Sequence, residues 1–183
     1  VGYSKYHIDT LIDDLAETPV RVTFVYEEAQ VPERYKTWDM LCGIAGSHSR
    51  PWAVVGDFNE VLHGHEHDGV GNRSQAQMDT FRDALDTCGL SDIGYTRLNW
   101  TFEKRVAGGT YTRVMLYRCV ANNEWLLNFP ATNLEHKTAV GSDHLPILLR
   151  LCDVHACSSG AISFKYETMW ERDENLFTVV SSR

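Results

Sequence analysis

A short apolar run in the first third of the chain ends in a polar turn, and this combination limits the folds open to it. Trp52-Ala53-Val54-Val55 contains no polar residue, and Gly56-Asp57-Phe58-Asn59 follows directly. A strand without alternation is usually buried on both faces, because an exposed face carries polar residues at every second position. The run therefore predicts a central strand covered on both sides, ending in a loop where rigid scaffolds often place reactive groups.

Strands and helices are expected to alternate along the chain. Ser74 and Gln77 have the spacing of a capping box at a helix start, and Gly108-Gly109 predicts the turn of a hairpin. In chain order, the expected elements are a strand at 21–26, a helix from Pro32 to about Gly46, a strand at 52–55, a helix from Ser74 to Gly89, a hairpin of 100–105 with 111–120, a helix at 122–129 and a strand at 145–151. The uneven strands favour an α+β fold, a two-sheet β-sandwich flanked by helices, over a doubly wound parallel sheet.

The charge is unevenly distributed. The 183 residues include 17 Lys and Arg against 25 Asp and Glu, so the formal net charge is −8, which argues weakly against a nucleic-acid partner. The stretch 95–120 differs, because it holds five basic residues and the single acid Glu103. Two interpretations stay open: this stretch faces a phosphate backbone, with Arg113 and Arg118 as substrate contacts, or it is a solvated hairpin with long basic side chains.

Several protein classes are disfavoured. No apolar run approaches the roughly 18–20 residues that cross a bilayer, and the N-terminus lacks a basic region followed by an apolar one. The five cysteines form no CxxC pair and are odd in number, which favours a reduced, intracellular setting. His63, His65 and His67 fit no standard zinc spacing, so a surface loop is a better interpretation than a transition-metal site. We expect an intracellular protein without a membrane partner.

Two polar clusters at strand ends carry the candidate chemistry. Asp57 and Asn59 follow the first apolar strand, and Asp143-His144 precedes the last one. A carboxylate that accepts a proton from water, an amide that donates to a phosphoryl oxygen, a carboxylate that holds a divalent cation and an imidazole together suit phosphodiester hydrolysis. Each cluster alone is also explained as a turn stabilised by hydrogen bonds from side chain to backbone.

The two clusters together resemble a known family. Trp52–Glu60 (WAVVGDFNE), followed by Ser142-Asp143-His144, is similar to the endonuclease/exonuclease/phosphatase superfamily, which includes exonuclease III-like and DNase I-like enzymes. More closely, PWAVVGDFNEVL, QMDTFRDALDTCGLSDIGY, NNEW and GSDHLPILL, in that order, resemble the endonuclease domain of plant non-LTR (LINE-type) retrotransposons. The resemblance implies a DNase I-like fold, magnesium-dependent nicking of DNA, a reverse transcriptase domain in the parent polyprotein and, for an active element, a nuclear location.

The resemblance also assigns roles to residues. It implies that Asp57 activates water, that Asn59 contacts the phosphate, and that Asp143 and His144 form the family's final Asp-His pair, with Asp143 at the magnesium ion. The role implied for His144 is to stabilise the charge that builds up on phosphorus.

Two aromatic residues have weaker assignments. Tyr26 matches the family tyrosine that contacts the scissile phosphate, and an ordinary aromatic at a strand end is an equally good interpretation. Trp100 lies near the aromatic residue of the DNA-facing hairpin, where packing within the hairpin is the better interpretation.

The chain also departs from the family pattern. Tyr117 stands where the family has an aspartate that orients the histidine, and Glu27 stands where a small residue is usual. The family's asparagine-bearing and glutamate-bearing first strands have no counterpart, so we expect a domain at 1–151 that is truncated and incomplete at its N-terminus. Residues 152–183 are expected to be a linker and a connector toward an absent reverse transcriptase.

These departures leave three functions in competition. The first is a weak or inactive remnant of a magnesium-dependent endonuclease, because magnesium tolerates few missing ligands and proton-transfer assistance contributes roughly 10²–10⁴-fold. The second is a catalytically inert remnant or binding module. The third is a phosphatase or RNA nuclease of the same superfamily, since a fold does not fix its substrate.

Overall fold

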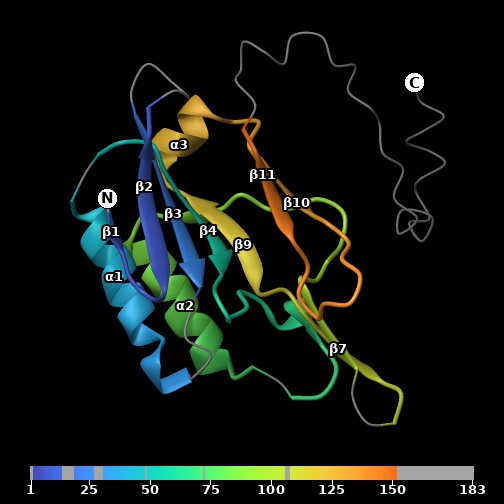
Figure 1. Cartoon of the computed structure of the whole chain (residues 1–183). Helices are drawn as coiled ribbons and strands as arrows, with labels where there is room; N and C mark the ends of the chain where they lie inside the picture. Colours follow the sequence, from blue (N-terminus) through green and yellow to red (C-terminus); the bar gives the residue numbers. More distant parts are fainter. Residues whose placement is uncertain are drawn as a thin grey trace, which may run out of the picture.

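A six-stranded mixed sheet forms the centre of the molecule (Figure 1). The computed structural model describes residues 2–13, 19–26, 31–47, 49–71, 73–105 and 108–151, so Glu27 and the expected connector at 152–183 lie outside the described residues. In spatial order, the strands are β1 (Gly2–Tyr3), β2 (His7–Ile12), β3 (Val20–Tyr26), β4 (Trp52–Asp57), β9 (Tyr117–Ala121) and β6 (Ser91–Asp92). β3 and β4 pair in parallel, and the other neighbours pair antiparallel.

Two smaller sheets accompany the central sheet. β10 (Asn133–His136) and β11 (Ile147–Arg150) form an antiparallel ribbon that lies across the β4–β9 side of the central sheet in Figure 1. β5 (His67–Asp68), β8 (Tyr111–Val114) and β7 (Phe102–Arg105) form a three-stranded sheet that contains the expected hairpin. The glycines between β7 and β8 have the positive φ that the hairpin turn requires, with φ 93° at Gly108 and 86° at Gly109.

Two helices cover the other face of the central sheet. α1 (Tyr35–Ala45) follows the short 3-10 helix η1 (Val31–Glu33), and α2 (Gln75–Thr87) begins at the predicted Ser74–Gln77 capping box. A second 3-10 helix, η2, spans Gly64–Glu66, and α3 spans Asn123–Asn128. Within the described ranges, no helix combines the length and the apolar character that crossing a membrane requires.

The central sheet is buried on both faces because its strands supply apolar residues to two cores. Val54 and Val120 face the helices, where Trp38 of α1 stacks on Phe81 of α2 with ring centroids 4.8 Å apart. The opposite core packs against the β10–β11 ribbon, and its members are Val20, Val22, Ala53, Val55, Cys119, Ala121, Trp125, Phe129 and Leu134. The predicted α+β sandwich with flanking helices is therefore confirmed, as is the two-sided burial of the run at 52–55.

Part of the strand assignment was wrong. The second arm of the hairpin was expected to span 111–120, but β8 ends at Val114 and β9 begins at Tyr117 in a different sheet. Between them, the Met115 N–H donates to the Glu66 carbonyl oxygen, and the Leu116 carbonyl oxygen accepts the Phe58 N–H. Both residues are buried and apolar like their neighbours, so the residue pattern gave no sign of the change of sheet. β2 and β10 were not predicted.

Candidate functional site

Two of the candidate side chains, Tyr26 and Asp57, lie in one row with Tyr117 across the central sheet. Tyr26 ends β3 and pairs in register with Asp57 at the end of β4, which pairs with Tyr117 at the start of β9. Residues paired across neighbouring strands point to the same face of a sheet. The row therefore presents two phenol groups and a carboxylate on the face that also carries the β10–β11 ribbon.

His144 contacts one end of this row. Its Nδ1 lies 2.8 Å from the Tyr117 hydroxyl oxygen, and the two rings stack with centroids 5.5 Å apart. Phe102 approaches the imidazole edge-on at 5.0 Å, and the Glu103 N–H donates to the Asp143 carbonyl oxygen at 2.8 Å. The hairpin thus holds the segment that carries Asp143 and His144 against the ends of β4 and β9, although the two polar clusters are far apart in the chain.

The loop after β4 is fixed by its own side chains. The Asp57 carboxylate accepts the N–H of Asn59 at 2.9 Å, and Asn59 has a left-handed backbone with φ 47°. The next residue, Glu60, is buried; its carboxylate pairs with Arg34 and lies 3.6 Å from the guanidinium of Arg73. These contacts hold Asn59 beside Asp57.

Burial shifts the pKa of Asp57 and of Tyr117. It raises the pKa of Asp57 to about 6, although the hydrogen bond from the Asn59 N–H and electrostatic interactions with His144, Arg34 and Arg73 oppose this effect. Burial also raises the pKa of Tyr117 to about 12, with further contributions from the charges of Asp57, Tyr26 and Asp143. At pH 7.5 Asp57 is therefore mostly ionised, whereas Tyr117 keeps its proton.

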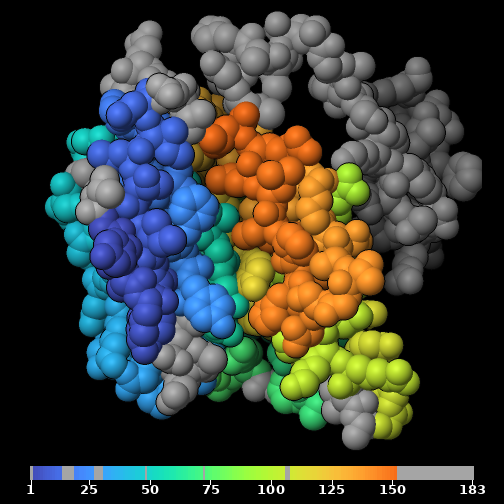
Figure 2. Space-filling view, viewed as in Figure 1, coloured from blue at the N-terminus to red at the C-terminus, as the bar shows by residue number. Residues whose placement is uncertain are grey.

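The row lines one end of an open groove. The groove has a volume of about 330 Å³, and Figure 2 shows it as a hollow between the blue surface of β2 and β3 and the orange surface of β11. Its polar lining residues are Tyr26, Asp57 and Tyr117, and its apolar ones include Phe24, Ile147 and Leu149. The candidate site is therefore accessible from solvent along this groove.

The expected magnesium site is poorly supported by the donor set. Among the residues that the structure describes, no group of three or more His, Cys, Asp or Glu side chains is arranged to hold a metal ion. Asp143 is exposed, and it lies close enough to influence the pKa of Tyr117. The loop at 63–67 offers no better metal site. The rings of His63 and His65 stack on each other with centroids 5.4 Å apart, and His67 belongs to β5.

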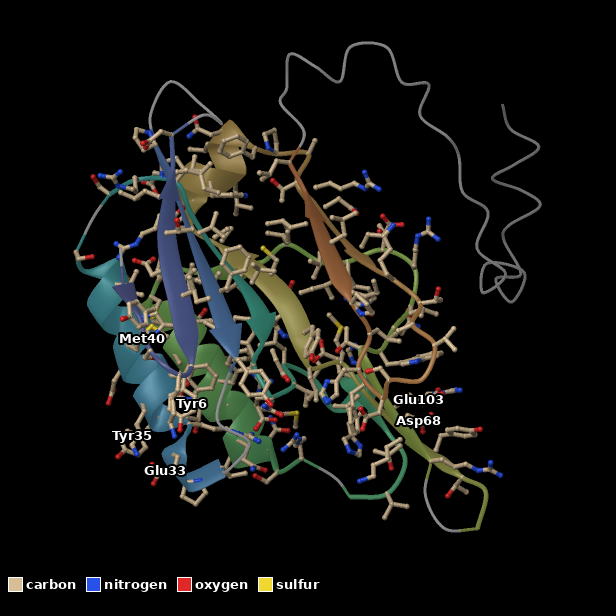
Figure 3. All side chains as sticks on the ribbon, in the orientation of Figure 1. Tyr6, Glu33, Tyr35, Met40, Asp68 and Glu103 are labelled. Carbon is tan, nitrogen blue, oxygen red and sulfur yellow. The ribbon has the colours of Figure 1, made fainter. Side chains whose placement is uncertain are left out.

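The predicted substrate residues have different surroundings. The Arg113 guanidinium lies 4.3 Å from the centroid of the Trp100 ring and pairs with Glu103 at 2.5 Å. Trp100 and Arg113 also line a hollow of about 180 Å³ beside Asp68. Figure 3 labels Asp68 and Glu103 at this side of the molecule, next to β7. This hollow is separate from the groove at Asp57.

The role expected for Arg118 is corrected by the structure. Its guanidinium is fully buried and lies 2.8 Å from Glu66 and 2.5 Å from Asp92. Successive residues of a strand point to opposite faces, so Arg118 points away from the face that carries Tyr117. Arg118 therefore joins the η2 loop to β6 inside the protein, and it is not exposed to a substrate.

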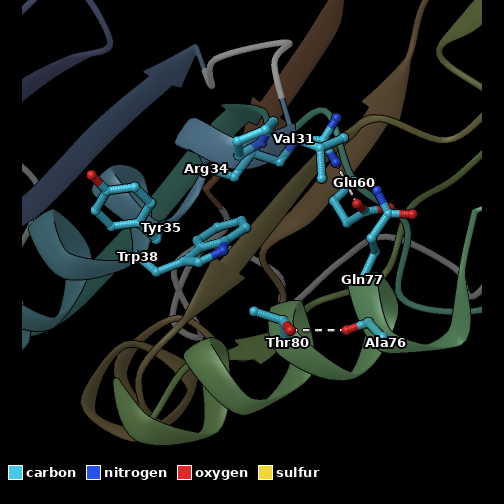
Figure 4. Close-up of a pocket in the computed structure, with 9 residues that line it drawn as sticks. Val31, Arg34, Tyr35, Trp38, Glu60, Ala76, Gln77 and Thr80 are labelled. Atoms are coloured by element: carbon cyan, nitrogen blue, oxygen red, sulfur yellow. Dashed lines mark hydrogen bonds and ion pairs between the residues drawn. The ribbon is translucent and has the colours of Figure 1, made fainter.

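Sequence reasoning missed two supports of the site. Thr101 is fully buried, and its hydroxyl oxygen accepts the N–H groups of Leu116 and Tyr117, both at 2.9 Å. No local pattern distinguishes this threonine. The second support is the buried Arg34–Glu60 ion pair, which lines a pocket of about 230 Å³ between α1 and α2 (Figure 4). Glu60 lies within the motif at 52–60, but its partner on the first helical segment was not predictable from spacing.

Comparisons with known proteins bear on the fold. No protein-family model matches the sequence, and no curated protein matches it. Among solved structures, the chain is similar to the endonuclease domain of TRAS1, a telomere-specific non-LTR retrotransposon, with a TM-score of 0.64 and 15% identity. The chain has the DNase I-like fold. This match covers 80% of the chain and 63% of the TRAS1 domain, so the chain spans less than two thirds of that structure's length.

Two further structures are more distant. The beta toxin of Staphylococcus aureus matches with a TM-score of 0.55 and 15% identity over 81% of this chain and 57% of the toxin. A mannosyl-6-phosphatase of Bacteroides thetaiotaomicron has a TM-score of 0.37 and 16% identity over 73% of this chain and 51% of that chain, which is too distant to support an argument. At these identities the likeness concerns the fold, and the chemistry must be argued from the site.

Proposed function

We propose that this chain hydrolyses phosphodiester bonds in DNA, as an endonuclease domain of the plant LINE-type class. One observation carries the proposal: Tyr26, Asp57 and Tyr117 form a row across three strands, and His144 contacts its end. The motif at Asp57 and Asn59 and the fold shared with the TRAS1 endonuclease domain support the same reaction class.

In the proposed reaction, the Asp57 carboxylate accepts a proton from water as the water oxygen attacks phosphorus. The bond from phosphorus to the 3′ oxygen breaks, and this oxygen takes a proton from solvent, which leaves a 3′-hydroxyl and a 5′-phosphate. Tyr26, whose side chain is exposed, donates a hydrogen bond to a phosphoryl oxygen. His144 stabilises the negative charge that develops on the phosphoryl group.

A magnesium ion is expected only because of the sequence resemblance to the retrotransposon endonuclease domain. Asp143 is the residue expected to hold it, and the described residues do not fit a cage of three or more protein ligands. No step of the proposed reaction is therefore assigned to the ion. The expected enzyme is slow, because its own residues supply a base and hydrogen-bond donors without a built metal site.

The same proposal includes the cellular context. A reverse transcriptase in the parent polyprotein and, for an active element, a nuclear location follow from the sequence resemblance alone, whereas the intracellular setting follows from the cysteine usage. They are independent of the chemistry at Asp57.

A plasmid-nicking assay tests the proposed function. Purified chain is incubated with supercoiled DNA in magnesium or in EDTA, and we expect slow conversion to open circles that is lost in Asp57→Ala. Asp83→Asn, which changes an exposed carboxylate on α2, is the matched control and should keep the activity. Absence of nicking by the unmodified chain under both conditions would exclude catalysis on DNA.

A catalytically inert binding module is the second candidate. It is favoured by Tyr117, which occupies the place where the resemblance expects a carboxylate beside the histidine. Binding of duplex DNA without nicking, measured by fluorescence anisotropy, would support this candidate. Cleavage of RNA or of a phosphomonoester, with none of duplex DNA, would instead support the third function, an RNA nuclease or phosphatase.

A further inference from the structure

The contact between Tyr117 and His144 determines which nitrogen of the imidazole carries the proton. The Tyr117 hydroxyl oxygen lies 2.8 Å from Nδ1 of His144, which is a hydrogen-bond distance. A neutral imidazole has one N–H and one bare nitrogen, and the group bonded to one nitrogen fixes the state of the other.

The tyrosine is the donor in this hydrogen bond. Its hydroxyl keeps its proton at neutral pH, because burial and nearby negative charges raise the pKa of Tyr117 and disfavour the phenolate. A phenol O–H is a strong donor, and a bare imidazole nitrogen is a better acceptor than a phenol oxygen. With Nδ1 as the acceptor, the imidazole proton is on Nε2.

A carboxylate at the same place would have the opposite effect. A carboxylate only accepts hydrogen bonds, so it holds a proton on Nδ1 and leaves Nε2 of the neutral ring as a base. With Tyr117, the neutral ring has a donor at Nε2 and no base there. The two arrangements therefore give the histidine different chemistry.

Packing adds to the orientation of the ring. Tyr117 stacks on the imidazole with an interplanar angle of 27°, and Phe102 contacts it edge-on at 62°. Phe102 and His144 also form an isolated β-bridge, so the backbone on which His144 sits is tied to β7. The imidazole is half-buried, and its position is set from two sides.

We infer that Tyr117 is a positioning residue whose hydroxyl holds neutral His144 with its proton on Nε2, as a hydrogen-bond donor to the scissile phosphoryl oxygen. The second half of this inference rests on the proposed function. In this arrangement His144 stabilises charge on the phosphoryl group and does not transfer protons, so Asp57 is the base of the site.

Tyr117→Phe tests the inference, because it removes the hydroxyl and keeps the ring. The imidazole nitrogens of His144 are observed by ¹⁵N NMR at pH 8, well above the ordinary histidine pKa of about 6.5. We expect a protonated Nε2 and a bare Nδ1 in the unmodified chain, and a mixture of the two tautomers in Tyr117→Phe. Tyr3→Phe, an exposed hydroxyl deletion, should leave the spectrum unchanged. A proton on Nδ1 in the unmodified chain would overturn the inference.

Nicking kinetics test the second half of the inference, in which His144 donates a hydrogen bond to the scissile phosphoryl oxygen. Loss of the group that hydrogen-bonds to a metal-ligating histidine typically costs roughly 10–100-fold in activity; by analogy, we expect kcat of Tyr117→Phe to fall about tenfold, with KM for DNA unchanged. An unchanged kcat would overturn the positioning role. If the unmodified chain nicks no DNA, the proposed function fails, and the NMR result still decides whether Tyr117 sets the tautomer.

Discussion

At the scale of single residues, the ionised form of Asp57 that the proposed reaction requires lowers the stability of the fold. Asp57 is 3% exposed, and burial raises its pKa from 3.8 to about 6. The folded state therefore binds the Asp57 proton more tightly than the unfolded state does. This contribution to stability is complete below pH 3.8 and is lost as pH rises through about 6. At neutral pH the ionised carboxylate that the proposed reaction requires is present at a cost in stability.

Asp57→Asn should therefore stabilise the fold while it abolishes nicking. At pH 8 in EDTA, we expect the free energy of unfolding to rise by on the order of 2 kcal/mol, since each pKa unit corresponds to about 1.4 kcal/mol. At pH 4 the difference should nearly vanish. Urea denaturation at both pH values is the measurement, with Asp83→Asn as the control. A loss of stability at pH 8 would contradict the assigned direction of the pKa shift.

At the scale of elements, the parallel contact of β3 with β4 sets the position of the row formed by Tyr26, Asp57 and Tyr117. Gly56 precedes Asp57, and its φ of 144° lies in a region that favours glycine. A Cβ atom at this position would lie 2.0 Å from the carbonyl oxygen of Val25 on β3. Glycine thus allows the two strands to approach directly beside the site.

Gly56→Ala should destabilise the protein and displace Asp57. We expect a loss of about 3 kcal/mol or more, because a backbone atom cannot yield as a flexible side chain does. Thermal unfolding is the measurement. Gly43→Ala is the matched control: it lies within α1 with no heavy atom within 4 Å of the added Cβ, so it should stabilise by roughly 0.5–1 kcal/mol. Equal effects of the two variants would refute the close approach of the strands.

At the scale of the whole molecule, the proposed function requires a chain with a formal net charge of −8 to bind an acidic polymer. Of the five basic residues in the stretch 95–120, Arg118 is buried, and Arg97 and Arg113 are paired with Glu135 and Glu103. Lys104 and Arg105 are exposed on β7. If DNA is the substrate, these two exposed cations on the hairpin are suited to contact its phosphates.

The double variant Lys104→Gln, Arg105→Gln should weaken DNA binding and leave the chemistry intact. We expect KM for plasmid DNA to rise several-fold with kcat unchanged, and the salt dependence of binding to become shallower because fewer phosphates are neutralised. Nicking rates between about 50 and 200 mM salt check this. Unchanged KM and salt dependence would mean that the hairpin does not contact DNA.

Sequence reasoning succeeded where the signal is local. The two-sided burial of 52–55, the capping box at Ser74 and the glycine turn at 108–109 each depend on a few neighbouring residues, and all are present in the structure. Sequence reasoning failed where a contact with a distant segment of the chain determines the local structure. The interruption between β8 and β9 is set by two hydrogen bonds: the Met115 N–H donates to the Glu66 carbonyl oxygen, and the Phe58 N–H donates to the Leu116 carbonyl oxygen. Met115 and Leu116 are buried and apolar, like the other residues of a strand.

The sequence by itself determined the helices, the central strands, the α+β class and the chemical identity of Asp57, Asn59, Asp143 and His144, because side-chain chemistry and short-range periodicity are properties of adjacent residues. Only the tertiary structure decided that Tyr117 contacts His144, that Arg118 is buried and that Thr101 and Arg34 support the site. Such facts depend on strand register and on the packing of segments far apart in the chain, and neither is encoded in the residues nearby.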